Sequence, residues 1–300
     1  MPTLSHRHAR TVHLWAHAPF AALCDTRVVA EPVLIAQLTD THVVGWNTDT
    51  ELYVDNNRRT ADAVAMLNAE VPAPAAVVMT GDLVNDARPD EYEALGDLLA
   101  PLDIDVLPLP GNHDDRTLVR ATFPDFGWAD TDHLSWVRVV DGVRVVGLDS
   151  TRPGHPGAEF DRERVDWLRA ALDTTHDGVT VLAMHHPPFV TGIDWMDRAG
   201  FIGLDVFTEI VRDSAVDRII CGHMHRPIGS AVGGVAAQVA MSTVQHVALD
   251  LTPAARVSLV RDPVGYQVHR IDGGDVVTHS RYIDTAEVSF EPDWADDHYA

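Results

Sequence analysis

The sequence predicts an α/β fold with a mostly parallel sheet, and two features of the chain carry this prediction. Short apolar runs alternate with segments of helical periodicity over the first half of the chain, as they do in βαβ units. Several of these runs also end directly in a cluster of aspartate, asparagine or histidine. Because ligands of open α/β sheets bind beyond the carboxyl ends of the strands, the second feature also predicts where a binding site lies.

The first half of the chain contains three expected strands and two expected helices. A helix is expected over residues 60–69, where apolar residues recur at helical spacing, and Pro72 follows its end. A second helix begins at Pro89, which suits the first helical position, and runs to about residue 99. The three strands are expected at residues 33–36, 76–79 and 105–109.

The second half of the chain begins with an expected hairpin and ends in β-rich sequence. Residues 134–140 and 143–148 would pair across Asp141-Gly142, a dipeptide that favours a tight hairpin turn. Helices are expected at 161–172 and 204–212. Further strands are expected at residues 179–184, 219–220, 235–239, 247–249, 257–260, 266–271 and 276–282.

The 300 residues are enough for one substantial domain, which we expect over residues 31–285. Residues 1–30 are expected to form a flexible N-terminal extension. His17 and Pro19 interrupt the apolar stretch there, so a secretory signal is not expected. Residues 286–300 are expected to form an acidic, exposed tail.

Net charge and cysteine content restrict the partners and the compartment. The formal net charge is −23, which argues against broad binding to nucleic acid or to an anionic membrane, since both require a basic surface. The negative net charge is still compatible with a small phosphate-ester substrate, because bound metal ions make the local charge of a binding site positive. The two cysteines are too few for a disulfide framework and fit a reducing, cytoplasmic compartment. No apolar run has the length needed to span a membrane.

Seven side chains at five strand ends have the chemistry of metal ligands. Mixed imidazole and carboxylate ligands favour zinc, manganese or iron over calcium or magnesium. Seven ligands exceed what one tetrahedral zinc needs, and they suit two ions about 3.5–4 Å apart that share a carboxylate and a water or hydroxide. His113 is left free for chemistry. The candidate ligands are Asp40, His42, Asp82, Asn112, His185, His223 and His225.

These motifs, taken together and in this order, resemble those of the calcineurin-like metallophosphoesterase family. They are Asp40-x-His42, Gly81-Asp82, Gly111-Asn112-His113-Asp114, His185-His186-Pro187-Pro188 and Gly222-His223-Met224-His225. Further stretches, including Gly265-Tyr266-Gln267-Val268-His269, are similar to the bacterial class III cyclic-nucleotide phosphodiesterases and to the related glycerophosphodiesterases.

The resemblance implies a four-layer α/β/β/α sandwich, in which two mixed sheets are flanked by helices. It also implies that the β-rich part from about residue 230 completes the second sheet or contributes to a homodimer contact. The metals would be two divalent or mixed-valence transition-metal ions, iron or manganese first, with zinc as an alternative. One ion would be held by Asp40, His42, Asp82 and His225, and the other by Asp82, Asn112, His185 and His223.

The same resemblance assigns roles around the metals. Asn112 and His113 would contact the phosphate, and His113 would protonate the leaving alkoxide, a task suited to imidazole near neutral pH. Asp114 could orient that imidazole or cap the next helix. In the family the first histidine of the pair is the ligand, so His186 is not expected to touch metal. His155 lies where a substrate-facing loop is expected, and an exposed loop histidine without a role is an equal alternative.

The leading hypothesis is therefore metal-dependent hydrolysis of a phosphodiester such as 3′,5′-cyclic AMP, in which a metal-bridging hydroxide attacks phosphorus. Glycerophosphodiester hydrolysis and broad-specificity phosphatase activity are the alternatives within the family. A non-catalytic regulatory module is a third class, which a full set of ligands and His113 disfavours. A dinuclear hydrolase of the lactamase type would need a His-x-His-x-Asp-His run, but Arg226 and Pro227 follow His225.

Overall fold

The computed structural model describes residues 31–48, 55–129, 131–253 and 255–283. The chain divides into Met1–Glu31 and Pro32–Ala300, and the description that follows concerns the second of these units. The expected extension at 1–30 and the expected tail at 286–300 lie outside the described residues. Among the residues described, no helix combines the length and the apolar character needed to cross a bilayer.

The first sheet contains the strands predicted in the first half of the chain and the last hairpin. Its order is β16-β15-β1-β2-β3. The central strands β1 (Val33–Leu38), β2 (Ala76–Thr80) and β3 (Val106–Leu109) are parallel. β15 (Gly265–Asp272) pairs antiparallel with β1, and β16 (Asp275–Tyr282) pairs antiparallel with β15.

The second sheet has the order β11-β12-β10-β8-β5-β4. Neighbours β5, β8, β10 and β12 run parallel, whereas β4 and β11 are antiparallel strands at the two edges. Its strands are β4 (Trp136–Val140), β5 (Val143–Leu148), β8 (Thr180–Met184), β10 (Arg218–Cys221), β11 (Ile228–Val232) and β12 (Val235–Val239).

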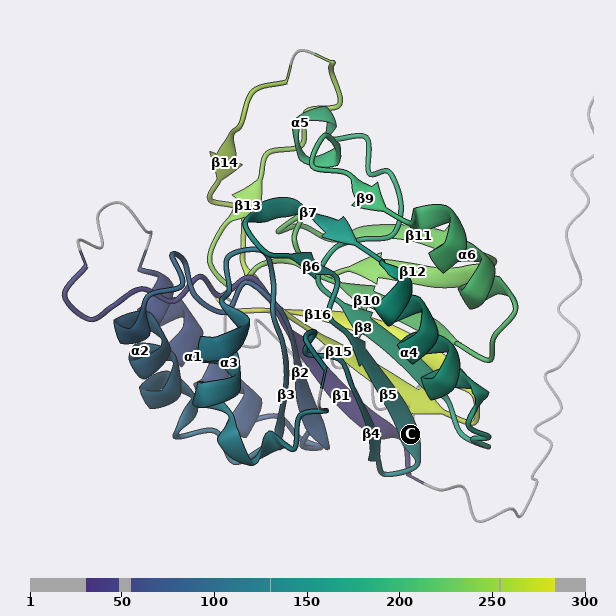
Figure 1. Ribbon diagram of the computed structural model, residues 1–300. Helices are drawn as coiled ribbons and strands as arrows, with labels where there is room; N and C mark the ends of the chain where they lie inside the picture. The colour runs from purple at the N-terminus through teal and green to yellow at the C-terminus, as the bar shows by residue number, and fades with distance from the viewer. Residues whose placement is uncertain (1–30, 49–54, 130, 254, 284–300) are drawn as a thin grey trace, which may run out of the picture. The chain divides into compact units, whose positions relative to one another are not determined.

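Helices cover the outer face of each sheet, as Figure 1 shows. The helices α1 (Asn56–Asn68), α2 (Pro89–Leu99) and α3 (Arg116–Thr122) flank the first sheet, and α4 (Arg162–Asp173) and α6 (Leu204–Arg212) flank the second. A cluster of buried apolar side chains fills the space between the two sheets, with Val78 from the first sheet and Val181 from the second. The expected four-layer sandwich is confirmed.

Shorter elements surround this framework. The strands β13 and β14 overlap the strands expected at 247–249 and 257–260, whereas the other short elements were not predicted. One small sheet joins β6, β7 and β9, and a separate two-stranded hairpin joins β13 and β14. The elements are β6 (Thr151–Arg152), β7 (His155–Glu159), β9 (Phe201–Ile202), β13 (His246–Val247), β14 (Leu259–Val260), α5 (Asp194–Asp197) and a 3-10 turn at Pro124–Phe126.

Two differences from the predicted elements have clear physical causes. α1 begins at Asn56, four residues before the expected start, because the Asn56 amide donates to the backbone oxygen of His42 and fixes the loop after β1. The β-rich sequence beyond residue 230 contributes to both sheets, since β11 and β12 extend the second sheet while β15 and β16 lie on the first. The latter pairing is long-range and has no local signal.

Candidate metal centre

The loops that follow five strands are joined to one another by backbone hydrogen bonds at one end of the two sheets. After β1, the amides of Asp40 and His42 donate to the backbone oxygens of Gly81 and Asp82 after β2, both at 3.0 Å. The His113 amide, after β3, donates to Asp82 Oδ1 at 2.9 Å. In the second sheet, the amide of Gly222 after β10 donates to the backbone oxygen of His185 after β8 at 2.9 Å. The His223 amide donates to Asp40 Oδ1 at 3.1 Å and so joins the two sheets.

The first group of gathered side chains contains Asp40, His42, Asp82 and His225, all buried, with one potential ligand atom from each within 4.8 Å of the others. His42 Nε2 lies 3.0 Å from His225 Nε2 and 3.6 Å from Asp82 Oδ2. His225 Nε2 lies 3.4 Å from Asp40 Oδ1. These are the four residues expected around one of the two ions.

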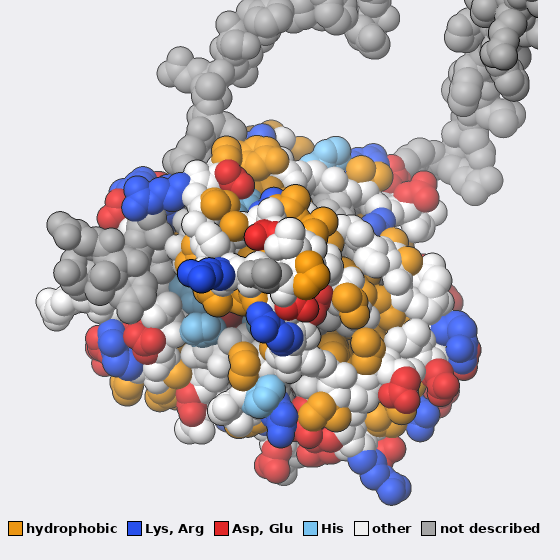
Figure 2. Space-filling model, turned by 90° about the horizontal axis from the view of Figure 1, so that it is seen from above, with side chains coloured by type: hydrophobic (Ala, Val, Ile, Leu, Met, Phe, Trp, Pro, Cys, Tyr) orange, Lys and Arg blue, Asp and Glu red, His pale blue; other side chains and the backbone are white. Residues whose placement is uncertain are grey.

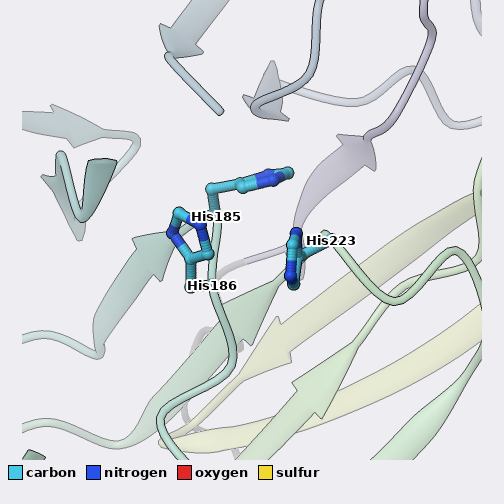
Figure 3. A group of neighbouring side chains, drawn as sticks. All are labelled: His185, His186 and His223. Carbon is cyan, nitrogen blue, oxygen red and sulfur yellow. The ribbon is translucent and has the colours of Figure 1, made fainter. Parts of the chain in front are cut away.

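The second group contains the imidazoles of His185, His186 and His223 (Figure 3), which also lie within 4.8 Å of one another by their nearest ligand atoms. His185 Nε2 lies 3.4 Å from Asp82 Oδ1 and 3.1 Å from Asn112 Oδ1. The structure therefore brings Asp82, Asn112 and His185 together, with His223 beside them at a ring distance of 5.1 Å from His185.

His186 differs from its two neighbours because protein groups occupy both of its ring nitrogens. Nε2 lies 3.2 Å from the backbone oxygen of Pro156, which can only accept, so Nε2 carries the hydrogen. Nδ1 then accepts from the Ser150 hydroxyl at 2.9 Å. In Figure 3 its ring leaves the shared loop in a different direction from that of His185. His186 thus ties the loop after β5 and the strand β7 to the site, with no nitrogen left for an ion.

The orientation of the other imidazoles suits metal ligation. His185 Nδ1 donates to the backbone oxygen of Thr80 at 2.8 Å, and His225 Nδ1 donates to that of Gln245 at 3.0 Å. Each bond fixes the tautomer in which Nε2 presents a lone pair to the site, as the ligating histidines of metal sites commonly do. The donor set of imidazole, carboxylate and amide fits a transition metal.

The protonation of the site also fits a cation. Burial alone would raise the pKa of Asp82, but the surrounding imidazoles, that of His185 first, hold it well below its usual range. Burial lowers the pKa of His223 to about 3, so this imidazole is neutral, as a ligand must be. Burial would likewise lower the pKa of His185, yet the Asp82 and Asp40 carboxylates raise it to about 9. A bound cation would replace the proton that His185 otherwise holds.

Five of the gathered residues have left-handed backbone, with φ of 52° at Asp40, 41° at His42, 50° at Asp82, 71° at His223 and 55° at His225. This conformation costs an L-residue about 1 kcal/mol or more, and such strain concentrates at functional sites. The strain turns side chains from neighbouring strand ends toward a common point. No sequence signal marks it, because aspartate and histidine are not residues that demand this conformation.

Replacement of Gly222 by alanine is expected to disrupt the site. A Cβ atom there would lie 2.1 Å from Thr39 Oγ1 and 2.9 Å from Asp40 Oδ2, so the loops after β1 and β10 would have to separate. We expect a loss of about 1–3 kcal/mol of unfolding free energy and a clear fall in bound metal. Gly229→Ala, where a Cβ meets nothing within 4 Å, is the matched control. Equal metal content and equal melting temperature in both variants would contradict this prediction.

His113 lies beside both groups and belongs to neither. Its Nδ1 donates to the backbone oxygen of Asn85 at 2.6 Å, and its ring meets the His42 ring edge-on at 4.7 Å. Burial would lower the pKa of His113, but the Asp82 carboxylate and the Asn85 oxygen raise it above the ordinary value. The imidazole is therefore held in place, and its protonated form persists to a higher pH than that of an ordinary imidazole.

Asp114 makes neither of the two contacts considered for it. The Asn85 carbonyl, rather than Asp114, holds the His113 ring, and Asp115 caps α3 by accepting from the amides of Thr117 and Leu118. The Asp114 carboxylate instead accepts from the amides of Leu83, Val84 and Gly111 and from the Tyr92 hydroxyl. It thereby joins the loops after β2 and β3, which carry Asp82 and His113.

His155, expected on a substrate-facing loop, lies at the start of β7. His155 Nδ1 accepts from the amide of Gly157 at 3.0 Å. A cavity of about 700 Å³ that includes Asn112 and His113 is lined by Arg152, Pro153 and Gly154, and His155 is not part of its wall. No site role was predicted for Arg152 from the sequence.

This arrangement matches a known family. The family model for calcineurin-like phosphoesterases matches residues 33–227, which include every gathered side chain. The chain belongs to the calcineurin-like phosphoesterase family. It is accordingly a metallophosphoesterase, and the fold and the enzyme class predicted from the motifs are confirmed.

Curated relatives and a solved structure extend the comparison. The chain is 29% identical over 255 residues to a probable glycerophosphodiester phosphodiesterase of Arcobacter nitrofigilis, covering 84% of this chain and 93% of the relative. It is 31% identical over 235 residues to a cAMP/cGMP dual specificity phosphodiesterase of Mycobacterium tuberculosis, covering 76% and 72%. The fold is similar to that of a purple acid phosphatase from yellow lupin, with a TM-score of 0.65, 11% identity, and coverage of 86% of this chain and 53% of the phosphatase.

Proposed function

We propose that the chain is a dinuclear metal-dependent phosphodiesterase whose leading substrate is 3′,5′-cyclic AMP. One observation carries the dinuclear part of the proposal. The two oxygens of the Asp82 carboxylate face different imidazoles, Oδ2 toward His42 at 3.6 Å and Oδ1 toward His185 at 3.4 Å. A carboxylate in this position can be shared between two cations.

The proposed ligands divide between two sites on either side of Asp82. Asp40, His42, Asp82 and His225 would hold one ion. Asp82, Asn112, His185 and His223 would hold the other. Iron or manganese is proposed first, as the family resemblance implies, and zinc as the alternative, since imidazole, carboxylate and amide ligands suit all three. When bound, the ions would supply an activated water as nucleophile and Lewis-acid stabilisation of the phosphate oxygens.

The protein's own groups would then position the phosphate and handle the leaving oxygen. Asn112 and His113 line the same cavity, so both can contact a phosphate beside the two groups of ligands. His113, with Nδ1 fixed on Asn85, can present a protonated Nε2 to the departing alkoxide. The pKa of His113, raised above its ordinary value, supports this role as an acid.

The relatives support a diester substrate, because both a glycerophosphodiesterase and a cyclic-nucleotide phosphodiesterase are similar to the chain over most of its length. Glycerophosphodiester hydrolysis is therefore the second candidate, and a broad-specificity phosphatase is the third. The non-catalytic module is disfavoured, since all seven proposed ligands and His113 are gathered in one place.

The decisive experiment combines metal analysis with a substrate panel. The purified chain, loaded with manganese or iron, is expected to contain about two ions per chain and to hydrolyse 3′,5′-cyclic AMP, with slower turnover of monoesters. Brisk monoester turnover with failure on every diester would refute the diesterase proposal. A metal content near zero, with no activity after reconstitution, would refute the metal centre itself.

The proposal also covers the partners of the protein, its oligomeric state and its place in the cell. On the face that Figure 2 shows, basic side chains are scattered among acidic and apolar ones and form no continuous stripe, which supports the absence of a nucleic-acid partner. We propose a small phosphodiester as the partner, without nucleic acid or membrane, and a homodimer in the cytoplasm. The molar mass in solution tests the dimer.

A further inference from the structure

The cavity beside His113 is large compared with the phosphate that it would have to accommodate. Its volume is about 700 Å³, within the range of small-molecule binding pockets. Its wall comes from the loop after β2, the loop between β3 and α3, Asp132, and the turn between β6 and β7. Asn112 and His113 also line it, so a group attached to a phosphate bound at these residues can extend into this cavity.

Most charged groups of this wall already have partners. The Asp114 carboxylate accepts from three backbone amides, and Asp115 caps α3. Asp86 lies 3.5 Å from the Arg88 guanidinium. Arg116 forms an ion pair of 2.7 Å with the buried Asp149. These groups build the wall and have little capacity left to bind a ligand.

Two charged groups of opposite sign are the exception. Among the described residues, neither the Arg152 guanidinium nor the Asp132 carboxylate has a hydrogen-bond or ion-pair partner. The Arg116 guanidinium holds their two segments side by side, since it donates to the backbone oxygens of Asp132 at 3.4 Å and of Thr151 at 3.0 Å. The Arg152 guanidinium, a hydrogen-bond donor, and the Asp132 carboxylate, a hydrogen-bond acceptor, therefore both line this cavity and can bind a ligand.

We infer that this cavity binds the nucleobase of the substrate, and that Arg152 and Asp132 select for it. The edge of a base offers an acceptor beside a donor, and these complement a guanidinium and a carboxylate. A glycerol group would leave most of the volume empty. The inference rests on the proposed function and narrows it to nucleotide diesters.

The test compares two phosphodiesters, one that carries a nucleobase and one that lacks it. Wild type, Arg152→Ala and Asp132→Asn, all loaded with manganese, are assayed with 3′,5′-cyclic AMP and with methyl 4-nitrophenyl phosphate. We expect the ratio of kcat/KM for the two substrates to fall roughly 10- to 100-fold in Arg152→Ala and several-fold in Asp132→Asn, through KM for the cyclic nucleotide. Calorimetry with 5′-AMP should show weaker binding in the same order.

Arg169→Ala is the matched control, because Arg169 is an exposed arginine of α4 that lines a different cavity. Its substrate ratio is expected to equal that of the wild type. If Arg152→Ala lowers kcat/KM for both diesters equally, or for neither, the inference is wrong while the proposed function stands. If the wild type hydrolyses no diester, the proposed function is wrong and the inference fails with it.

Discussion

Replacement of Asp82 by asparagine is expected to remove most of the bound metal and to lower phosphodiester turnover by roughly 1000-fold or more. Among the described residues, Asp82 is the one carboxylate whose two oxygens face both groups of imidazoles, at 3.4 Å and 3.6 Å. Asparagine keeps the shape of the side chain, but it loses the negative charge and one of the two oxygens. Two cations would then share a buried site with one carboxylate, that of Asp40.

The measurement is metal content per chain by elemental analysis, together with kcat/KM after reconstitution. Asp114→Asn is the matched control, because Asp114 is a neighbouring carboxylate that faces backbone amides and Tyr92 instead of the imidazoles. This control is expected to keep its metal and to lose about 1–3 kcal/mol of unfolding free energy. An Asp82→Asn protein that retains two ions and near-normal turnover would overturn the assignment of Asp82 as a shared ligand.

The strand ends could be predicted from the sequence because their signals are local. An apolar run followed by aspartate, asparagine or histidine needs no knowledge of distant contacts, and the predicted strands before Asp40, Asp82, Asn112 and His185 all form. Their convergence follows from the rule that parallel strands end at one edge of a sheet. The family motifs predicted which ligands belong together around each ion. The structure brings the same side chains close to one another.

The parts that could not be predicted depend on long-range contacts. Both ring nitrogens of His186 have protein partners only because Ser150, after β5, and Pro156, in β7, lie close by in the fold. These residues are 36 and 30 positions away along the chain. The left-handed backbone at Asp82 and His223 is imposed by hydrogen bonds between loops of different strands. The placement of Arg152 and Asp132 in the wall of one cavity depends on Arg116, whose hydrogen bonds to both segments exist only once the chain is folded.

Replacement of His113 by alanine is expected to leave the metal content unchanged and to slow alkyl diesters by about 100- to 10,000-fold. An alkoxide is a poor leaving group and needs a proton as it departs, whereas 4-nitrophenolate departs without one. Turnover of a 4-nitrophenyl diester should therefore fall much less. The imidazole contacts Asn85 and the His42 ring and is not among the grouped ligands, so its removal leaves the ligand set complete.

The pH dependence gives a second readout for the same residue. The carboxylate of Asp82 and the Asn85 oxygen outweigh burial and raise the pKa of His113 above its ordinary value, so its acid form persists to higher pH. With an alkyl diester, kcat should decline as the pH rises through that pKa, because the proton donor is lost. His113→Ala should lack this decline, while His279→Ala, an exposed histidine on β16, should keep it. A wild-type pH profile and wild-type alkyl turnover in His113→Ala would show that another group protonates the leaving oxygen.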